Sequence, residues 1–148
     1  MLFRSLKVNS VSSIINDTIR MLNSSVSITI TTNTDYDKCL CDSARITEAF
    51  LAILTNCTES LNCDKILISV DVSDSGDSIE ISFLDNGTGF SADMLSQAAT
   101  PFSTEKDGHF GLSLSTASVI ILRHKGNLSV SNTPDGALVK VSLPVFNN

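Results

Sequence analysis

Apolar and polar residues alternate along several stretches of the chain with the two-residue period of a half-buried β-strand. In Val26–Thr32, for example, Val26, Ile28 and Ile30 are separated by serine and threonine. Comparable stretches are Lys38–Cys41, Lys65–Ser73, Ser78–Asp85, Asn127–Ser131 and Ala137–Leu143. The pattern therefore predicts a series of short strands, two of which form a hairpin across the turn Asp74-Ser75-Gly76-Asp77. The last two strands are joined by the turn sequence Asn132-Thr133-Pro134-Asp135-Gly136.

Other stretches carry apolar residues at the 3.6-residue period of an amphipathic helix. The clearest is Ser43–Leu61, in which Asn56 falls beside the apolar stripe and not at the centre of the solvent face. Val11–Leu22 is a second helix, with Ser10 as its N-cap. A third helix is predicted over Gly111–His124, and the basic-then-glycine sequence Arg123-His124-Lys125-Gly126 ends it.

The segment Asn86–His109 has no long periodic pattern and is rich in glycine and polar residues. It is too long for an idle connection in a compact domain, and long loops of this kind are usually functional. The strands are paired in hairpins instead of each being followed by a helix, which argues against a doubly wound parallel fold. We therefore expect a two-layer α/β sandwich, with a mixed, mostly antiparallel sheet covered on one face by helices.

The composition is that of a folded globular chain. Its 148 residues correspond to one domain, 42% of them are hydrophobic and 18% are charged. The net charge of −6 opposes binding to nucleic acid or to an anionic membrane surface. No apolar run approaches the roughly 20 residues of a membrane-spanning helix. The four cysteines have no C-x-x-C spacing, so reduced buried thiols in a cytoplasmic protein are favoured over a zinc site.

The common phosphate-binding and acyl-transfer motifs are absent from the sequence. The chain has instead Asp85-Asn86-Gly87-Thr88-Gly89-Phe90 at the end of a predicted strand. Here a carboxylate stands beside two glycines that can bring the main chain close to a ligand. Taken alone, this D-x-G-x-G sequence also fits a plain surface turn.

Three other motifs accompany this sequence in a fixed order along the chain. Glu48–Leu61 precedes it, and Pro101–Lys106 and Gly108–Ser115 follow it. In this order and spacing the four motifs resemble the N box, first glycine box, F box and second glycine box of the sensor histidine kinase ATP-binding domain. The resemblance extends over roughly Lys7 to Val145 and is closest to the nitrogen-regulation type of sensor kinase.

This resemblance implies the Bergerat fold, which is shared with gyrase, heat-shock chaperone and mismatch-repair ATPases and binds Mg²⁺-ATP beneath a lid. Asp85 corresponds to the aspartate that accepts a hydrogen bond from the adenine amine. Asn56 corresponds to the catalytic asparagine that binds Mg²⁺ through its amide oxygen. Gly87 and Gly89 would let the main chain approach the adenine.

The remaining ATP-binding positions implied by the resemblance follow the first glycine motif. The N-terminus of the third helix would present free N–H groups to the triphosphate, without a Walker lysine. Lys106 and His109 would add cationic contacts from the lid, although a solvated surface role fits them equally well. His124 is expected to be structural. The other expected ATP-binding residues are Phe102, Thr104, Gly108, Gly111 and Leu112.

The sequence also departs from the family pattern. Ala52 stands where ATP-hydrolysing relatives carry a glutamate base, which argues against hydrolysis and against the anti-sigma serine kinases. His109 and Phe110 replace part of the second glycine box, and Ala137 stands where many relatives carry threonine.

No phosphoacceptor histidine motif is present, so the expected role is that of a catalytic domain of a longer sensor kinase. It would pass the γ-phosphoryl group of ATP to a histidine on a separate dimerisation domain, for later transfer to a response regulator. The alternative is a catalytically weakened pseudo-kinase module that senses nucleotide or docks to another protein.

Overall fold

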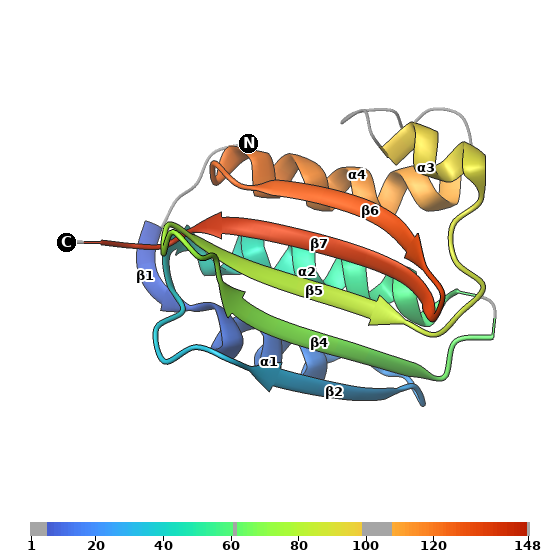
Figure 1. Ribbon diagram of the computed structural model, residues 1–148, viewed down its shortest axis with the longest axis horizontal. Coiled ribbons are helices and arrows are strands. Elements are labelled where there is room, and N and C mark those ends of the chain that lie inside the picture. The colour runs from blue at the N-terminus through green and yellow to red at the C-terminus, as the bar shows by residue number, and fades with distance from the viewer. Residues whose placement is uncertain (1–5, 61, 99–107, 148) are drawn as a thin grey trace.

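The computed structural model describes residues 6–60, 62–98 and 108–147. Within them a five-stranded sheet carries α1, α2 and α4 on one of its faces, and β1 and β3 form a separate two-stranded sheet (Figure 1). The strands are β1 (Leu6–Ser10), β2 (Ser27–Thr32), β3 (Lys38–Asp42), β4 (Lys65–Val72), β5 (Ser78–Asp85), β6 (Asn127–Thr133) and β7 (Gly136–Pro144). The helices are α1 (Val11–Met21), α2 (Ser43–Thr58), α3 (Ala92–Ala98) and α4 (Gly108–Arg123). This architecture confirms the predicted two-layer α/β sandwich.

The larger sheet has the strand order β2-β4-β5-β7-β6. β2 runs parallel to β4, whereas all the other neighbours are antiparallel. The predicted hairpin of β4 and β5 is present, with Ile68 opposite Phe83. The sheet is therefore mixed and mostly antiparallel, as the sequence pattern indicates.

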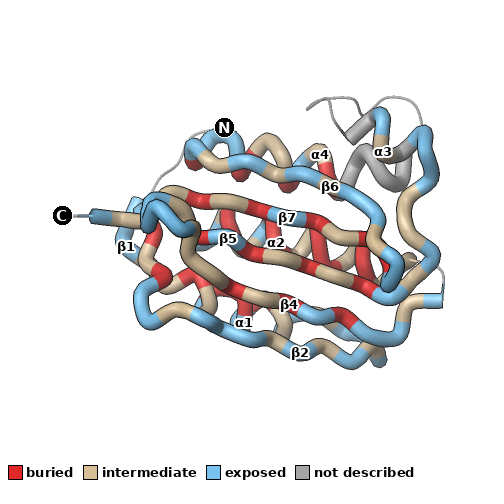
Figure 2. Tube along the Cα trace, viewed as in Figure 1, coloured by how far each residue is buried: buried red, intermediate tan, exposed pale blue. Residues whose placement is uncertain are grey.

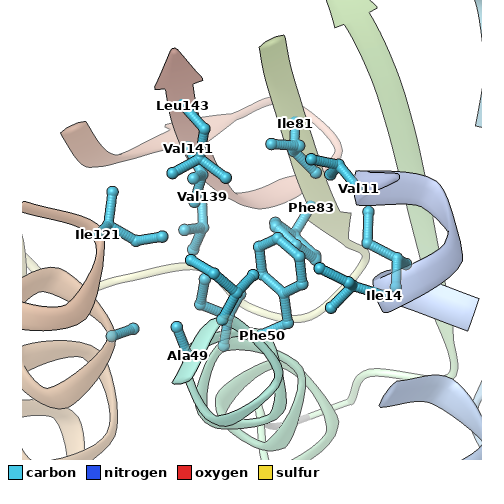
Figure 3. Packing of buried hydrophobic residues seen from close by; sticks show 14 of the residues in the cluster. Val11, Ile14, Ala49, Phe50, Ile81, Phe83, Ile121, Val139, Val141 and Leu143 are labelled. Carbon is cyan, nitrogen blue, oxygen red and sulfur yellow. The ribbon is translucent and has the colours of Figure 1, made fainter. Parts of the chain in front are cut away.

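The core lies between this sheet and the helices, as the red segments in Figure 2 show. On β4, for example, Ile66, Ile68 and Val70 are buried while Leu67 between them is 44% exposed. Phe50 of α2 packs against Phe83 of β5 with ring centroids 5.7 Å apart (Figure 3). The alternation seen in the sequence thus becomes a buried inner face and a solvated outer face.

The sequence pattern does not predict β1. This strand has no buried residue and pairs only with β3, from Leu6 opposite Asp42 to Ser10 opposite Lys38. A strand that contributes nothing to the core carries little hydrophobic signal, so its pairing partner decides its conformation.

The segment predicted as one long loop also differs from the structure. It contains the short helix α3, and α4 begins at Gly108, about one turn before the predicted start at Gly111. Gly108 and His109 add nothing to the apolar pattern that predicts the helix, so this pattern places the helix start too late. The hairpin strands β6 and β7 each extend further into the turn than predicted.

His124 joins the C-terminal end of α4 to the N-terminal end of α2. Its Nε2 accepts a hydrogen bond from the main-chain N–H of Asp42 at 3.1 Å, and Nδ1 lies 2.9 Å from the carbonyl oxygen of Ile120. Since the Asp42 N–H can only donate, the ring proton is on Nδ1 and is donated to Ile120. Asp42 also caps α2 by accepting from the Arg45 N–H. His124 is therefore structural, as predicted.

Cys39, Cys41 and Cys57 are buried, as expected for reduced core thiols, whereas Cys63 is only partly buried. All four cysteines are free thiols. Across residues 6–60, 62–98 and 108–147, histidine, cysteine and acidic side chains form no group of three or more that could hold a metal ion. None of the helices in this described part has the length and apolar character needed to cross a membrane.

A first prediction follows from the two faces of β4. Replacing Ile68 by alanine should lower the free energy of unfolding by about 2–5 kcal/mol, because it leaves a cavity in the core. Leu67→Ala is the matched control on the exposed face and should cost about 1 kcal/mol or less. Urea denaturation measures both, and equal losses for the two variants would contradict the assignment of the faces.

Candidate functional site

The carboxyl end of β5, the C-terminal end of α2, the N-terminal end of α4 and the β6–β7 turn all lie at the right-hand end of the molecule in Figure 1. α2 and α4 pack against each other and run in opposite directions. Residues that are far apart in the sequence therefore meet at one end of the sandwich. Asp85 and Asn56 both belong to this end.

Asp85 is the last residue of β5 and is only 3% exposed. Its Oδ1 accepts a hydrogen bond from the Gly87 N–H at 2.9 Å and another from the Ala137 N–H at 3.3 Å. The β5–β7 ladder ends at the pair Leu84 and Leu138, so the next main-chain N–H of β7, that of Ala137, donates to the Asp85 side chain instead. Both of these bonds end on Oδ1, so they fix the direction in which the carboxylate points.

Gly136 is the residue that lets β7 approach Asp85 so closely. A Cβ atom on Gly136 would stand 2.0 Å from the Asp85 carbonyl oxygen, and the Gly136 φ of +149° lies in a region that favours glycine. The glycine of the predicted Asn132–Gly136 turn is thus required by the site as well as by the turn.

Asn86 fixes the next residue of the motif to the start of β4. Its Oδ1 accepts from the N–H groups of Asp64 and Lys65, both at 3.0 Å, and its Nδ2 donates to the Asp64 carboxylate at 2.7 Å. The Asn86 N–H also donates to the Lys65 carbonyl oxygen. Gly87 and Gly89 then lead away from this anchor, and Gly89 has a φ of +88°.

Cys57 lies on α2 next to Asn56 and close to Asp85. Burial raises the pKa of the Cys57 thiol, and the nearby Asp85 carboxylate raises it further. The thiol is thus neutral at physiological pH, and it places an uncharged group beside the carboxylate.

Asn56 is half-buried in the last turn of α2, at the margin of the core stripe that the sequence predicts. In the described part of the chain, no side-chain hydrogen-bond partner is found for its amide. A neutral amide oxygen suits a hard cation that also takes phosphate oxygens and water. The side chain therefore fits the Mg²⁺ role expected from the sequence.

The other predicted site residues fall into two groups. Gly108, His109, Gly111 and Leu112 lie in the first turns of α4, whose main chain begins at this end of the molecule. Phe102, Thr104 and Lys106 lie outside the described residues. The structure thus places Asp85, Asn56, Gly87, Gly89 and the start of α4 at the same end of the sandwich.

Sequence reasoning overlooked Asn86, Asn132 and Cys57, and treated Gly136 only as a turn residue. Asn132 and Gly136 belong to an Asn-Thr-Pro-Asp-Gly sequence, whose local signal is that of a turn. The glycine segment that they contact lies more than forty positions earlier in the chain. No local signal could have found these contacts.

Comparison with protein families gives a match over residues 41–147 to the family described as histidine kinase-, DNA gyrase B- and HSP90-like ATPase. An NtrY-like protein of Rickettsia bellii, named as a sensor histidine kinase, is 29% identical over 121 residues, which are 81% of this chain and 20% of that protein. The sensor histidine kinase ZraS of Escherichia coli K12 is 31% identical over 121 residues, 81% of this chain and 26% of its own. The sensory histidine kinase/phosphatase NtrB of Rhodobacter capsulatus is 29% identical over 127 residues, 75% of this chain and 36% of its own.

Among solved structures, the mycobacterial sensor histidine kinase MprB superposes with a TM-score of 0.78 at 19% identity, covering 97% of this chain and all of the MprB chain. This similarity confirms the fold. The chain spans about a fifth to a third of the length of the curated relatives that it matches.

A second prediction follows from the contact between Gly136 and Asp85. Gly136→Ala should lower the free energy of unfolding by about 3 kcal/mol, because a strained φ and a clash with the Asp85 carbonyl add together. The matched control is Gly76→Ala, which has a φ of +81° and nothing within 4 Å of the added Cβ. It should cost only about 1 kcal/mol. Urea denaturation measures the stability of both variants. If Gly136→Ala is as stable as Gly76→Ala, β7 does not approach the Asp85 main chain as closely as the structure shows.

Proposed function

Because the chain belongs to the histidine kinase-, DNA gyrase B- and HSP90-like ATPase family, we propose that it is the ATP-binding catalytic domain of a sensor histidine kinase. It holds Mg²⁺-ATP at the end of the sandwich where Asp85, Asn56 and the start of α4 meet. The γ-phosphoryl group passes to a histidine on a separate dimerisation domain, and ADP leaves. The observation that carries the proposal is the buried Asp85 carboxylate, held through Oδ1 by two main-chain N–H groups.

Asp85 is suited to reading adenine because it is buried and oriented before any ligand binds. The Gly87 and Ala137 N–H groups occupy Oδ1, so Oδ2 can accept the exocyclic amine of the base. A buried carboxylate that meets a donor makes a charge-assisted hydrogen bond. Gly87 and Gly89, which lack side chains, leave room for the base beside the main chain.

The triphosphate would lie between the end of α2 and the beginning of α4. The first turns of α4 carry main-chain N–H groups without intrahelical partners, and the helix dipole favours an anion there. Asn56 would hold Mg²⁺, which when bound neutralises phosphate charge. Lys106, which precedes α4 in the sequence, and His109, in the first turn of α4, would add cationic contacts.

Ala52 favours transfer to another protein over hydrolysis. It lies one helical turn before Asn56 and is partly buried against the core. An alanine has no group that can remove a proton from water. Phosphoryl transfer to a histidine nitrogen needs chiefly positioning and charge neutralisation, which this site can supply without such a base.

His124 is not suited to be the phosphoacceptor histidine. His124 is 7% exposed, and its two ring nitrogens are engaged with the main chain of Asp42 and Ile120. Because the relatives are several times longer than the matched region, a dimerisation domain with the acceptor histidine is the expected partner. A response regulator would then receive the phosphoryl group.

A third prediction tests the adenine site. Asp85→Asn should weaken ADP and ATP binding by about 10- to 100-fold, because an amide replaces the charged acceptor. The variant should still fold, since the amide oxygen can accept from Gly87 and Ala137. Calorimetric titration measures the affinity, with Asp135→Asn on the exposed hairpin turn as the control.

Unchanged nucleotide affinity in Asp85→Asn would contradict the assignment of Asp85 as the adenine-binding residue. A folded wild-type chain that binds neither ADP nor ATP would favour the alternative, a pseudo-kinase module that docks to another protein.

A fourth prediction tests the metal ligand. Mg²⁺ should strengthen ATP binding by the wild-type chain, and in Asn56→Ala this Mg²⁺-dependent increase in affinity should be about tenfold smaller. In EDTA, Asn56→Ala should bind ATP with the same affinity as the wild-type chain. Asn16→Ala, an exposed asparagine on helix α1, is the control and should keep the full gain. If Asn56→Ala responds to Mg²⁺ as the wild-type chain does, another residue binds the metal.

A further inference from the structure

Asn132, near the end of β6, makes two hydrogen bonds with a single residue of the glycine segment. The Phe90 N–H donates to the Asn132 Oδ1 at 2.7 Å, and the Asn132 Nδ2 donates to the Phe90 carbonyl oxygen at 2.7 Å. One side chain thus pairs with both main-chain groups of Phe90, as a neighbouring strand would. Two short bonds in a reciprocal pair fix both distance and orientation.

Gly89 packs directly on the same amide group. A Cβ atom on Gly89 would lie 2.8 Å from the Asn132 Oδ1 and 3.2 Å from its Cγ. The φ of Gly89 is +88°, so this residue has both a steric and a conformational reason to be glycine. The Asn132 amide therefore contacts two consecutive residues of the segment.

The segment from Asp85 to Phe90 is held at both ends. At its start, the Asp85 carboxylate receives two main-chain N–H groups, and Asn86 pairs with Asp64 and Lys65. At its end, Asn132 ties Phe90 to the β6–β7 hairpin. Asn132 thus adds a main-chain anchor on the far side of the two glycines, beside the packing of the Phe90 side chain against the core.

We propose that Asn132 is a positioning residue of the nucleotide site, which holds Gly89 and Phe90 in the conformation that adenine binding requires. The inference rests on the proposed function, because the held segment is the one that would lie against the base. Ordering a glycine-containing segment costs conformational entropy. In the wild-type chain the segment is already ordered in the folded state, so this entropy cost is part of the free energy of folding. In a variant that lacks the Asn132 amide group, the segment would be ordered only when nucleotide binds, which would weaken binding.

The first test uses ¹⁵N-labelled protein. In Asn132→Ala, amide hydrogen exchange at Phe90 should be at least about tenfold faster, and ADP should bind about tenfold more weakly. Asn132→Asp retains the acceptor for the Phe90 N–H but loses the donor to the Phe90 carbonyl, so its ADP affinity should be intermediate. Asn127→Ala, an exposed asparagine on the same strand, is the matched control and should change neither quantity.

The second test is a double-mutant cycle with Gly89→Ala. Gly89→Ala alone suffers backbone strain and a clash with Asn132, whereas in the double variant the clash is gone. The double variant should therefore bind ADP at least about fivefold more tightly than the product of the two single effects predicts. The same coupling should appear in the equilibrium constants of unfolding.

Unchanged Phe90 exchange in Asn132→Ala, or additive effects in the cycle, would overturn the proposal. Faster exchange with unchanged ADP affinity would overturn it as well, because Asn132 would then be only structural. If the wild-type chain binds no ADP, the proposed function fails, while Phe90 exchange and the unfolding cycle still support or overturn the anchoring of this segment by Asn132.

Discussion

The contact between Gly136 and the end of β5 is the constraint on which the candidate site depends. It brings the first residues of β7 against the Asp85 main chain, so that the Ala137 N–H reaches the Asp85 carboxylate. The same hairpin carries Asn132 to Phe90. The close approach of β7 to the end of β5 thus fixes both the Asp85 carboxylate and the glycine segment that follows it.

The opposite end of the molecule stabilises this arrangement. There His124 of α4 accepts from the N–H of Asp42, the residue that caps α2. The two helices are thereby fixed to each other at the end far from Asp85, and their antiparallel packing sets where α2 ends and α4 begins. A hydrogen bond to an uncharged imidazole therefore helps to define the distance that the triphosphate would span.

Local groups of the site, and not the overall charge of the chain, would bind the proposed ligand. A chain with a net charge of −6 does not attract a polyanion by its overall field. The described part of the site offers main-chain N–H groups, a neutral amide and a neutral thiol around one oriented carboxylate. Such a site would bind the adenine end of ATP by hydrogen bonds. Mg²⁺ and the N-terminus of α4 would neutralise the charge of the phosphates.

The sequence by itself determined the layer architecture, because the periods of 2 and 3.6 residues reflect which side of each element meets the core. It also singled out Asp85 and Asn56, whose motifs are local and ordered along the chain. The tertiary structure alone decided the pairing of β1 with β3, the role of Gly136, and the contacts of Asn132 with Gly89 and Phe90. These depend on segments that are distant in sequence and meet only when the sheet forms, so no local pattern of residues records them.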